Sequence, residues 1–328
     1  MGNQLSSALV TVSYTGRHME GILEALRPAK IFCVAKDDYE GISNALREAE
    51  VAILDDDIND QILAEGKHLC WIHCNHAGIN NSARPEIFER GIILTGSAGR
   101  SGPVLAEHVF FLLLSLVYDS RTLEANQRSH AWEKIYVKRR GLFTKTMGIV
   151  GLGYTGREVA ARAKAFGMRV IAYDRAFDAL PENVDACYSA DLGESIDELL
   201  RESDVVVLSV RLSDETYHLI GEREFTLMKD NAYLINISRG SIVDEGALCK
   251  ALNDKQIAGA GSDVFTIEPL PADSPLWDLP NMIITPHSTP GMPDMPWNCV
   301  EIIRENVRRY RAGQLLLNQM EPRDIYTK

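Results

Sequence analysis

Short apolar runs alternate with longer stretches of mixed polarity from one end of the chain to the other. In the N-terminal third, the spacing of apolar residues predicts one helix that ends at Leu26 and another over Tyr39–Glu48. The apolar runs around them predict short strands, at residues 8–12, 31–34, 51–54, 69–73 and 92–95. Strands that alternate with helices favour a parallel sheet. We therefore expect a first α/β sheet of the flavodoxin type.

A second series of strand and helix signals begins near Thr146 and ends near Pro286. A long helix, predicted to start after Gly102-Pro103 and to run towards Asn126, separates it from the first series. The predicted strands are nearly continuous apolar runs, at residues 147–150, 170–173, 205–208, 232–237, 257–262 and 282–285. Such runs suit strands that are buried on both faces of a parallel sheet. The chain is thus expected to form two doubly wound α/β domains.

One more amphipathic helix is predicted near the C-terminus, over Cys299–Arg311, with an apolar stripe at Val300, Ile303, Val307 and Tyr310. The 328 residues are enough for about two domains, in agreement with the two series of strands. Hydrophobic residues make up 45% of the chain and charged residues 24%, which is the balance of a globular protein and excludes a disordered or fibrous one.

The charge of the chain restricts its partners. There are 34 Lys and Arg against 46 Asp and Glu, a net charge of −12, whereas nucleic-acid binding needs a basic surface. The longest apolar run, Val109–Tyr118, is half of the roughly 20 residues that span a bilayer. No basic segment followed by an apolar one opens the chain, and the six cysteines are scattered like reduced thiols. We expect a cytoplasmic protein with no nucleic-acid partner and no stable membrane association.

The first residues also fit a lipidation pattern, since Gly2 and Ser6 stand where N-myristoylation requires them. A short polar leader before the first strand explains the same residues. No basic cluster follows, and a single acyl chain without a second signal gives only marginal membrane binding. We therefore prefer the polar leader.

The strongest local signal is a glycine-rich turn directly after the predicted strand at 147–150. Gly151, Gly153 and Gly156, with Tyr154 and Thr155 among them, form a G-x-G-x-x-G pattern that leads into a stretch of helical spacing. These glycines allow a tight turn and a close approach of backbone N–H groups to a pyrophosphate at a helix N-terminus. A purely structural turn would use the same glycines. A dinucleotide site is the better explanation because an acidic residue follows at the right distance.

That acidic residue is Asp174, which ends the next predicted strand. An acid there hydrogen-bonds the adenosine ribose of a bound dinucleotide. Its carboxylate repels the 2′-phosphate of NADP, so the sequence predicts NAD as the cofactor. The adjacent Arg175 weakens this preference.

Further motifs surround the glycine-rich turn in a fixed order. They are Ala106-Glu107-His108, Leu227-Met228-Lys229, the stretch Leu-Ile-Asn-Ile-Ser-Arg-Gly-Ser-Ile-Val-Asp at 234–244, Asp263-Val264-Phe265, Glu268-Pro269 and Thr285-Pro286-His287. With these motifs the chain resembles the D-isomer-specific 2-hydroxyacid dehydrogenase family over nearly its whole length. The resemblance implies a Rossmann NAD-binding domain, residues 103–291, inserted in a flavodoxin-like substrate domain, residues 1–102 and 292–328. It also implies an active site in the cleft between them and a homodimer that packs through the long crossover helices.

Three residues match the catalytic residues of that family, and their chemistry suits the reduction of a 2-keto acid. Arg239 offers paired donors in a rigid fork for the substrate carboxylate. His287 can donate and accept a proton near neutral pH, because its unperturbed pKa lies near 6.5. Glu268 would orient that imidazole and favour its charged form. Each residue alone has an ordinary explanation as a loop or surface residue, and the prediction depends on their joint order after a Rossmann unit.

The resemblance implies further contacts. The turn at Ala77, Gly78 and Ile79 would present backbone N–H groups to the substrate carboxylate, as an anion-binding nest does. Asp263 would lie near the nicotinamide, Val210 and Thr216 would line the adenine side, and Ile237 would also contact the cofactor. Two residues depart from the family pattern, Asn80 where Asp is usual and Arg211 where Pro is usual, and we have no physical explanation for Arg211.

The segment after His287 departs most from the family, which usually has His-x-x-Gly. Here Pro290, Pro293 and Pro296 stiffen the segment 288–297. One hypothesis is that Met292, Met295 or Trp297 forms an apolar wall of the substrate pocket. The alternative is that the segment packs the cofactor domain against the last helix.

A cluster of possible metal ligands lies earlier, in the run from Cys70 to His76, which also contains His73 and Cys74. Strand alternation places Cys70, Ile72 and Cys74 on one face and Trp71 and His73 on the other. No second Cys/His pair follows at the spacing of a zinc finger. We therefore expect no metal site.

The main prediction is an NAD-dependent D-2-hydroxyacid dehydrogenase that interconverts a small 2-keto acid and the 2-hydroxy acid. Within the same class, a glyoxylate/hydroxypyruvate reductase and a phosphoglycerate dehydrogenase are alternatives, and the second is weakened because no regulatory domain follows Arg311. From another class, an NAD-sensing corepressor-like scaffold has the same fold. Turnover of a 2-keto acid would distinguish the enzymes from the scaffold.

Overall fold

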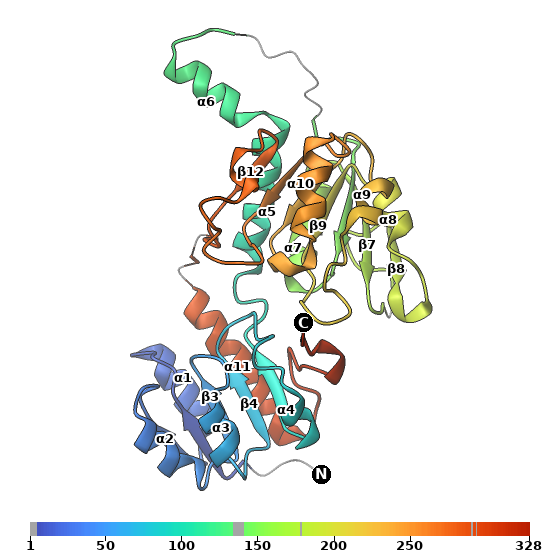
Figure 1. The fold of residues 1–328 in the computed structure, drawn as a ribbon. Coiled ribbons are helices and arrows are strands. Elements are labelled where there is room, and N and C mark those ends of the chain that lie inside the picture. Colours follow the sequence, from blue (N-terminus) through green and yellow to red (C-terminus); the bar gives the residue numbers. More distant parts are fainter. Residues whose placement is uncertain (1–4, 134–140, 178, 290, 293) are drawn as a thin grey trace. The chain divides into compact units, whose positions relative to one another are not determined.

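The computed structural model describes residues 5–133, 141–177, 179–289, 291–292 and 294–328. Gly2, on which the lipidation pattern depends, lies outside the described residues. The chain divides into two compact units, residues 1–101 with 291–328 and residues 102–290 (Figure 1). These boundaries differ by one residue from the predicted domain limits.

A five-stranded parallel sheet forms the centre of the first unit. Its strands are β1 (Ser7–Val10), β2 (Lys30–Cys33), β3 (Val51–Leu54), β4 (Trp71–Cys74) and β5 (Ile93–Gly96). They are arranged in the order β2-β1-β3-β4-β5, and every neighbouring pair is parallel. This is the flavodoxin order, so the first predicted sheet is confirmed.

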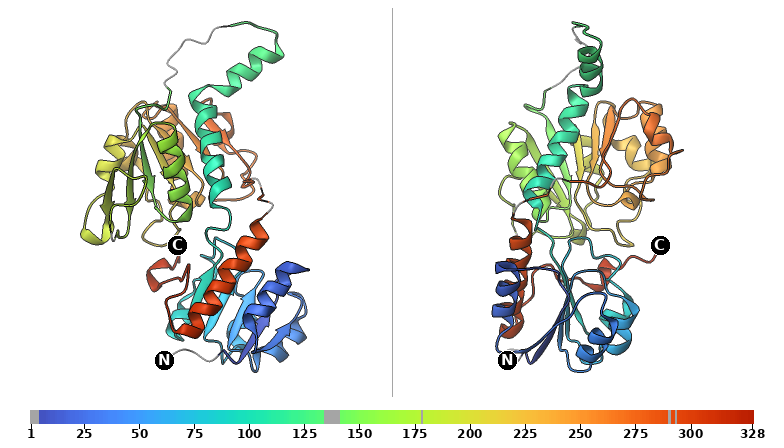
Figure 2. Two further views of the ribbon diagram at one scale, coloured as in Figure 1. Left: turned by 180° about the vertical axis from the view of Figure 1, so that it is seen from behind. Right: turned by 90° about the vertical axis from the view of Figure 1, so that its left-hand side faces the viewer.

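Helices cover both faces of this sheet (Figure 2). On one face lie α1 (Arg17–Leu26) and α11 (Met295–Ala312), and the predicted stripe of α11 is buried against the sheet, at Val300, Ile303, Val307 and Tyr310. On the other face lie α2 (Tyr39–Leu46), α3 (Asp60–Glu65) and α4 (Pro85–Glu89). A 3-10 turn, η4 (Pro322–Asp324), follows near the C-terminus. Asp38 and Asn59 start α2 and α3, because each side chain accepts a hydrogen bond from a backbone N–H three residues later.

The second unit contains a seven-stranded parallel sheet. Its strands are β6 (Thr146–Val150), β7 (Arg169–Asp174), β8 (Ala186–Ser189), β9 (Val205–Leu208), β10 (Tyr233–Asn236), β11 (Gly259–Ser262) and β12 (Met282–Ile284). The order is β12-β11-β10-β9-β6-β7-β8, with every neighbouring pair parallel. The direction of winding therefore reverses between β6 and β9, as in a Rossmann fold, and ligands bind at the carboxyl ends of the strands at such a point.

Helices also cover both faces of the second sheet. On one face, α5 (Gly102–Val117) and α7 (Tyr154–Ala165) pack on buried residues of β6, β7, β9 and β10. The other face carries α8 (Asp197–Glu202), α9 (Glu222–Leu227) and α10 (Glu245–Asn253). The remaining elements are α6 (Ser120–Arg128), η1 (Ala190–Leu192), η2 (Gly240–Ile242) and η3 (Pro275–Asp278).

One expectation about the second unit was wrong, and one of its strands was not predicted. The long helix predicted to run towards Asn126 is broken at Asp119, which has a left-handed φ of 51°. The Asp119 side chain accepts a hydrogen bond from the N–H of Thr122 and so starts the next helix, α6. In the described part of the chain no single helix is long and apolar enough to cross a membrane, and α5 with α6 meets that test only as a pair bent by 66°. The edge strand β8 had not been predicted, because Ala186, Cys187 and Tyr188 are only half-buried.

The segment after His287 is shorter than expected, because α11 begins at Met295. Trp297 lies in the first turn of this helix and faces α1. The Arg17 guanidinium carbon is 5.5 Å from the centroid of the indole, and the ring of His18 is 5.9 Å from it. These contacts lie within the first unit and bear on neither hypothesis for this segment. Pro290 and Pro293 lie outside the described residues.

Candidate active site

The glycine-rich turn joins β6 to α7 at the carboxyl end of β6. Gly151 has a φ of 89°, and a Cβ at this position would lie 2.7 Å from the backbone of Val210 at the end of β9. A Cβ on Gly156 would lie 2.3 Å from the carbonyl oxygen of Gly151, whereas one on Gly153 would meet nothing within 4 Å. Gly151 and Gly156 are therefore required by the tight turn, and Gly153 leaves open space in front of it.

The open space lies at the N-terminus of α7. In the described part of the chain, the backbone N–H groups of Gly153, Tyr154 and Thr155 donate no hydrogen bond to another protein group. Unpaired N–H groups and the positive end of a helix dipole attract phosphate. The turn therefore has the space, the donors and the partial charge that a pyrophosphate requires.

Asp174, the last residue of β7, contacts the same turn. One carboxylate oxygen accepts a hydrogen bond from the N–H of Leu152 at 2.6 Å, and the other accepts one from the N–H of Arg175 at 2.7 Å. A carboxylate has about four acceptor positions, so two remain for other donors. Asp174 can thus hold the turn and still accept a ribose hydroxyl.

Glu268 and His287 lie side by side on the loops that follow β11 and β12. Nδ1 of His287 is 2.7 Å from Oε2 of Glu268, while Oε1 of Glu268 accepts a hydrogen bond from the N–H of Phe265 at 2.8 Å. The His287 side chain is half-exposed. Its Nδ1 faces the carboxylate, so Nε2 is the ring nitrogen left for proton transfer.

Arg239 comes after β10, the neighbour of β11, and one of its guanidinium nitrogens donates to the carbonyl oxygen of Ser238 at 2.7 Å. The next residue, Gly240, packs on the loop that leads to Glu268, because a Cβ on it would lie 1.9 Å from the carbonyl carbon of Phe265. The structure thus places the Arg239 loop directly against the Glu268 loop, at the carboxyl ends of adjacent strands.

A hydrogen-bond network beneath His287 holds the backbone of its loop. His287 has a left-handed φ of 49°, which is strained for a residue other than glycine, and its N–H donates to the carbonyl oxygen of Asp263 at 2.9 Å. The Asp263 carboxylate accepts from the hydroxyl of Thr285 at 2.6 Å, from the N–H of Ser288 at 3.1 Å and from the hydroxyl of Thr289 at 3.2 Å. These bonds fix the chain on both sides of His287.

His108, on α5, completes this network. Its Nε2 lies 2.9 Å from Oγ1 of Thr285 and 3.5 Å from the Asp263 carboxylate, and both His108 and Asp263 are buried. Burial raises the pKa of Asp263, but the hydrogen bonds from His108, Thr285 and Ser288 outweigh it and leave that pKa below its ordinary value. From the sequence, Asp263 is expected near the nicotinamide, and no role is predicted for His108 or Thr285. Both residues belong to motifs noted in the sequence, Ala106-Glu107-His108 and Thr285-Pro286-His287. Their contact could not be predicted, because it joins residues far apart in the chain.

The remaining predicted cofactor residues lie on the same edge of the sheet. Val210 follows β9 and contacts the glycine-rich turn, and Ile237 directly follows β10 and is almost fully buried. The hydroxyl of Thr216 accepts from the N–H of Ser213 at 2.8 Å and donates to the carbonyl oxygen of Arg211 at 2.6 Å, so it folds its own loop. A direct cofactor contact for these three residues stays a prediction.

Ala77, Gly78 and Ile79 belong to the first unit, in the turn after β4. In the described part of the chain none of their backbone N–H groups donates a hydrogen bond. The carbonyl oxygen of His76 accepts from the N–H of Ser97 at 2.9 Å, and the Arg100 guanidinium donates to the carbonyl oxygen of Asn75 at 3.0 Å. The turn is held at its start and leaves three donors unused. Its binding of a substrate carboxylate stays a prediction.

The comparisons with known proteins agree with this arrangement. Residues 110–289 match the family model described as the NAD binding domain of D-isomer specific 2-hydroxyacid dehydrogenases. The chain is 35% identical over 284 residues to a glyoxylate reductase of Korarchaeum cryptofilum, which covers 83% of each chain, and 36% identical over 287 residues to one of Thermococcus litoralis, which covers 85% of each. A solved structure of a D-isomer specific 2-hydroxyacid dehydrogenase from Xanthobacter autotrophicus, in complex with NADPH and MES, matches with a TM-score of 0.79 and 27% identity, over 98% of this chain and 99% of that one.

The glycine-rich turn, the three loops that carry Arg239, Glu268 and His287, and these relatives all agree with one assignment. The chain belongs to the D-isomer specific 2-hydroxyacid dehydrogenase family and is an NAD(P)-dependent oxidoreductase that acts on CH–OH groups.

Proposed function

We propose that this protein reduces a small 2-keto acid, of the glyoxylate or hydroxypyruvate kind, to the D-2-hydroxy acid with NADH. The observation that carries the proposal is the contact between His287 and Glu268, 2.7 Å long, on loops next to that of Arg239 at the carboxyl edge of a dinucleotide-binding sheet. The names of the curated relatives support glyoxylate as the first substrate to test.

When bound, the reduced dinucleotide supplies the hydride; the glycine-rich turn and Asp174 would hold it. Arg239 binds the carboxylate of the keto acid, because its guanidinium offers two parallel donors. Nε2 of His287 donates a proton to the keto oxygen as negative charge develops there. Glu268 accepts from Nδ1 of His287, which fixes the tautomer and stabilises the imidazolium before the proton leaves. In the reverse direction the same nitrogen accepts the proton of the 2-hydroxyl group.

We propose NAD rather than NADP as the preferred cofactor because of Asp174. Its carboxylate lies at the end of β7 and accepts two backbone hydrogen bonds, so it is held in place and cannot turn away easily from a 2′-phosphate. Arg175 acts in the opposite direction, although its side chain lies 3.8 Å from Glu215, which offsets part of its charge. The Xanthobacter structure, solved with NADPH, makes NADPH the necessary comparison.

We also propose a homodimer that forms through α5 and α6. Phe111 on α5 is 54% exposed, Tyr118 in the turn between the helices 51%, and Leu123 on α6 41%; Trp132, beyond α6, is 93% exposed. Figure 1 shows α6 extending away from the rest of its unit, and α6 has no buried residue in this single chain. A groove of about 730 Å³ beside α5, lined by residues such as Leu116, Tyr233, Ile257 and Pro280, offers a place for a partner. Large apolar side chains exposed along one pair of helices favour a protein partner. Sedimentation of the wild type and of a Leu123→Asp variant would measure the dimer and its loss.

A cytoplasmic location remains our proposal. The six cysteines are free thiols in the structure, and a supply of NADH is needed for the reaction.

The test is NADH oxidation, followed by absorbance, with glyoxylate, hydroxypyruvate, pyruvate, phenylpyruvate and a branched 2-keto acid, each repeated with NADPH. We expect turnover of the small acids with NADH, a loss of at least about 100-fold in kcat/KM for Arg239→Ala, and no change for the control Arg304→Ala on α11. Wild-type protein that binds NADH but turns over none of these acids would overturn the proposal. Equal kcat/KM with NADH and NADPH would overturn the cofactor preference alone.

A further inference from the structure

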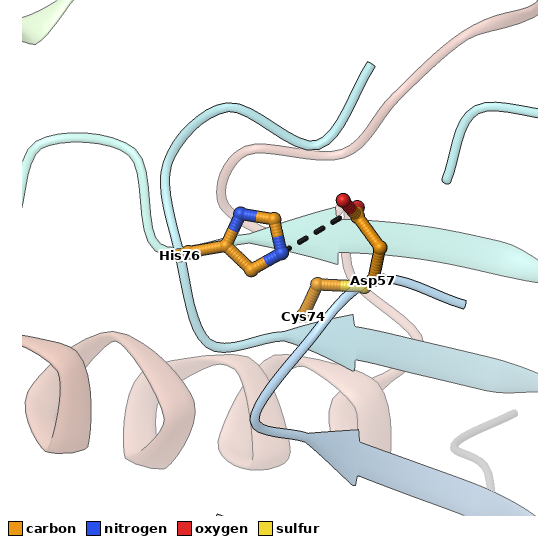
Figure 3. A group of neighbouring side chains, drawn as sticks. All are labelled: Asp57, Cys74 and His76. Carbon is orange, nitrogen blue, oxygen red and sulfur yellow. Dashed lines mark ion pairs between the residues drawn. The ribbon is translucent and has the colours of Figure 1, made fainter. Parts of the chain in front are cut away.

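Three side chains that can bind a metal ion meet at the carboxyl ends of β3 and β4 in the first unit. Asp57 lies in the loop after β3, Cys74 is the last residue of β4, and His76 is in the turn that follows (Figure 3). One oxygen, one sulfur and one nitrogen of these residues all lie within 4.8 Å of one another. The run Cys70–His76 alone predicts no metal site, but Asp57 comes from the loop after the neighbouring strand β3 and is not part of that run.

The contact between His76 and Asp57 is unusual for a hydrogen bond. Nε2 of His76 lies 3.5 Å from Oδ1 of Asp57, which is longer than the usual N–H···O distance of about 2.9 Å. Nε2 is buried and has no hydrogen-bond partner among the described residues. A buried ring nitrogen without a partner is costly, and such a group in a folded protein calls for an explanation.

The spacing fits ligands around a tetrahedral metal ion. With bonds of about 2.0 to 2.3 Å, ligand atoms of zinc lie roughly 3.3 to 3.8 Å apart. The 3.5 Å between Nε2 and Oδ1 falls in that range. A modest movement of the half-buried His76 and Asp57 side chains would bring Sγ of Cys74 close enough to bind the same ion. We propose that Asp57, Cys74 and His76 form a binding site for a zinc-class divalent cation, with a water molecule as the fourth ligand.

The surroundings of the three residues support this proposal. The Ser82 hydroxyl donates a hydrogen bond to Oδ1 of Asp57, and such a donor orients a carboxylate ligand. Cys74 is fully buried at the bottom of the site, whereas the side chains of Asp57 and His76 are 34% and 23% exposed and leave a way in from solvent. Burial keeps Cys74 protonated in the metal-free protein, since it raises the pKa of the thiol to about 12. Binding therefore forms an S–metal bond and releases the thiol proton to solvent.

The two charges of the ion suit the site. A thiolate and a carboxylate together neutralise a divalent cation, and the imidazole binds as the neutral ring. The neighbouring His73 does not compete for the ion, because its two ring nitrogens already contact the hydroxyls of Thr95 and Ser97. The ligand types, one nitrogen, one sulfur and one oxygen, favour zinc or cobalt over magnesium or calcium.

The test uses the full-length protein, freed of metal with a chelator and then titrated with Co²⁺. A thiolate ligand to Co²⁺ produces a charge-transfer band in the near ultraviolet, which cobalt bound by oxygen and nitrogen alone does not show. We expect one Co²⁺ per chain with this band, and its displacement by Zn²⁺. The band should disappear in Cys74→Ser, and the affinity should fall at least about tenfold in His76→Gln and in Asp57→Asn.

Cys70→Ser is the matched control, because Cys70 is exposed and only four residues away. It should leave the band and the affinity unchanged. Circular dichroism of each variant distinguishes the loss of a metal ligand from the loss of the fold. Substitution of His76 should disturb the fold least, because its side chain is only half-buried. The proposal would be overturned if the wild type showed no charge-transfer band. It would also be overturned if the band survived in Cys74→Ser or were lost in Cys70→Ser. The measurement needs no substrate or cofactor, so its result does not depend on the proposed reaction.

Discussion

The pH dependence of folding should reveal His73, a histidine that is fully buried in β4. Its ring nitrogens lie 2.9 Å from Oγ1 of Thr95 and 3.1 Å from Oγ of Ser97, and the side chain is 0% exposed. Burial, and to a smaller extent the nearby His76, lowers the pKa of His73 from 6.5 to about 3. The folded chain thus keeps this ring neutral where the unfolded chain protonates it.

The size of the effect follows from this difference in pKa. Below pH 6.5 the unfolded state binds one more proton than the folded state, so stability falls as the pH falls, by about 1.4 kcal/mol for each pH unit. The loss continues until the pH nears the folded value of about 3. At a pH about two units below the unfolded pKa, the loss is about 2.7 kcal/mol, a large part of the 5–15 kcal/mol by which domains are usually stable.

The assay is urea unfolding at a series of pH values between about 7.5 and 4.5, with wild type and His73→Gln in parallel. The carboxylates and the other histidines titrate alike in both proteins, so the difference in the free energy of unfolding isolates His73. We expect this difference to change by about 1.4 kcal/mol per pH unit below about pH 6.5. Parallel curves for the two proteins would show that burial does not keep His73 neutral. An imidazole nitrogen NMR shift typical of a charged His73 in the folded protein at pH 5 would show the same.

The other predictions concern the active site. Gly240→Ala should lower kcat/KM by about 100-fold or more, because its Cβ would lie 1.9 Å from the Phe265 backbone and push the Arg239 and Glu268 loops apart. The control is Gly246→Ala, whose Cβ would approach only a side-chain oxygen of Asp244, at 3.3 Å. Gly156→Ala should weaken NADH binding in a fluorescence titration, since its Cβ would lie 2.3 Å from the Gly151 carbonyl oxygen, and an unchanged Kd would contradict this. His108→Leu should destabilise the protein by about 1–3 kcal/mol and lower kcat, because it removes the donor to Thr285 and one of the polar neighbours of buried Asp263. His108→Gln, which keeps a donor, should recover part of both, and equal losses in the two variants would argue against the network.

Much of the fold could be predicted from the sequence, because strands buried on both faces leave apolar runs that are easy to recognise. The half-buried edge strand β8 leaves no such run, since Ala186, Cys187 and Tyr188 are small or amphipathic. The break between α5 and α6 had a local signal in Asp119, a residue type that often starts helices, but the apolar run before it concealed that signal.

The candidate site shows the same limit. Arg239, Glu268 and His287 could be found from motifs, since each stands in a characteristic short stretch. The bonds from Asp263 to Thr285, Ser288 and Thr289, and from His108 to Thr285, join residues far apart in the chain, and no local pattern specifies them. Asp57 was missed for the same reason, because its closeness to Cys74 and His76 depends on the pairing of β3 with β4.

Deuterium-labelled NADH tests whether hydride passes from the dinucleotide to C2 of the keto acid. Purified protein would be incubated with hydroxypyruvate and NADH that carries two deuterium atoms at C4 of the nicotinamide, one on each face. The product would be analysed by NMR and chiral chromatography. We predict D-glycerate with one deuterium at C2, and no deuterated product from a His287→Ala variant that still binds NADH. Product without deuterium at C2, the L isomer, or unimpaired transfer by the His287→Ala variant would contradict the account.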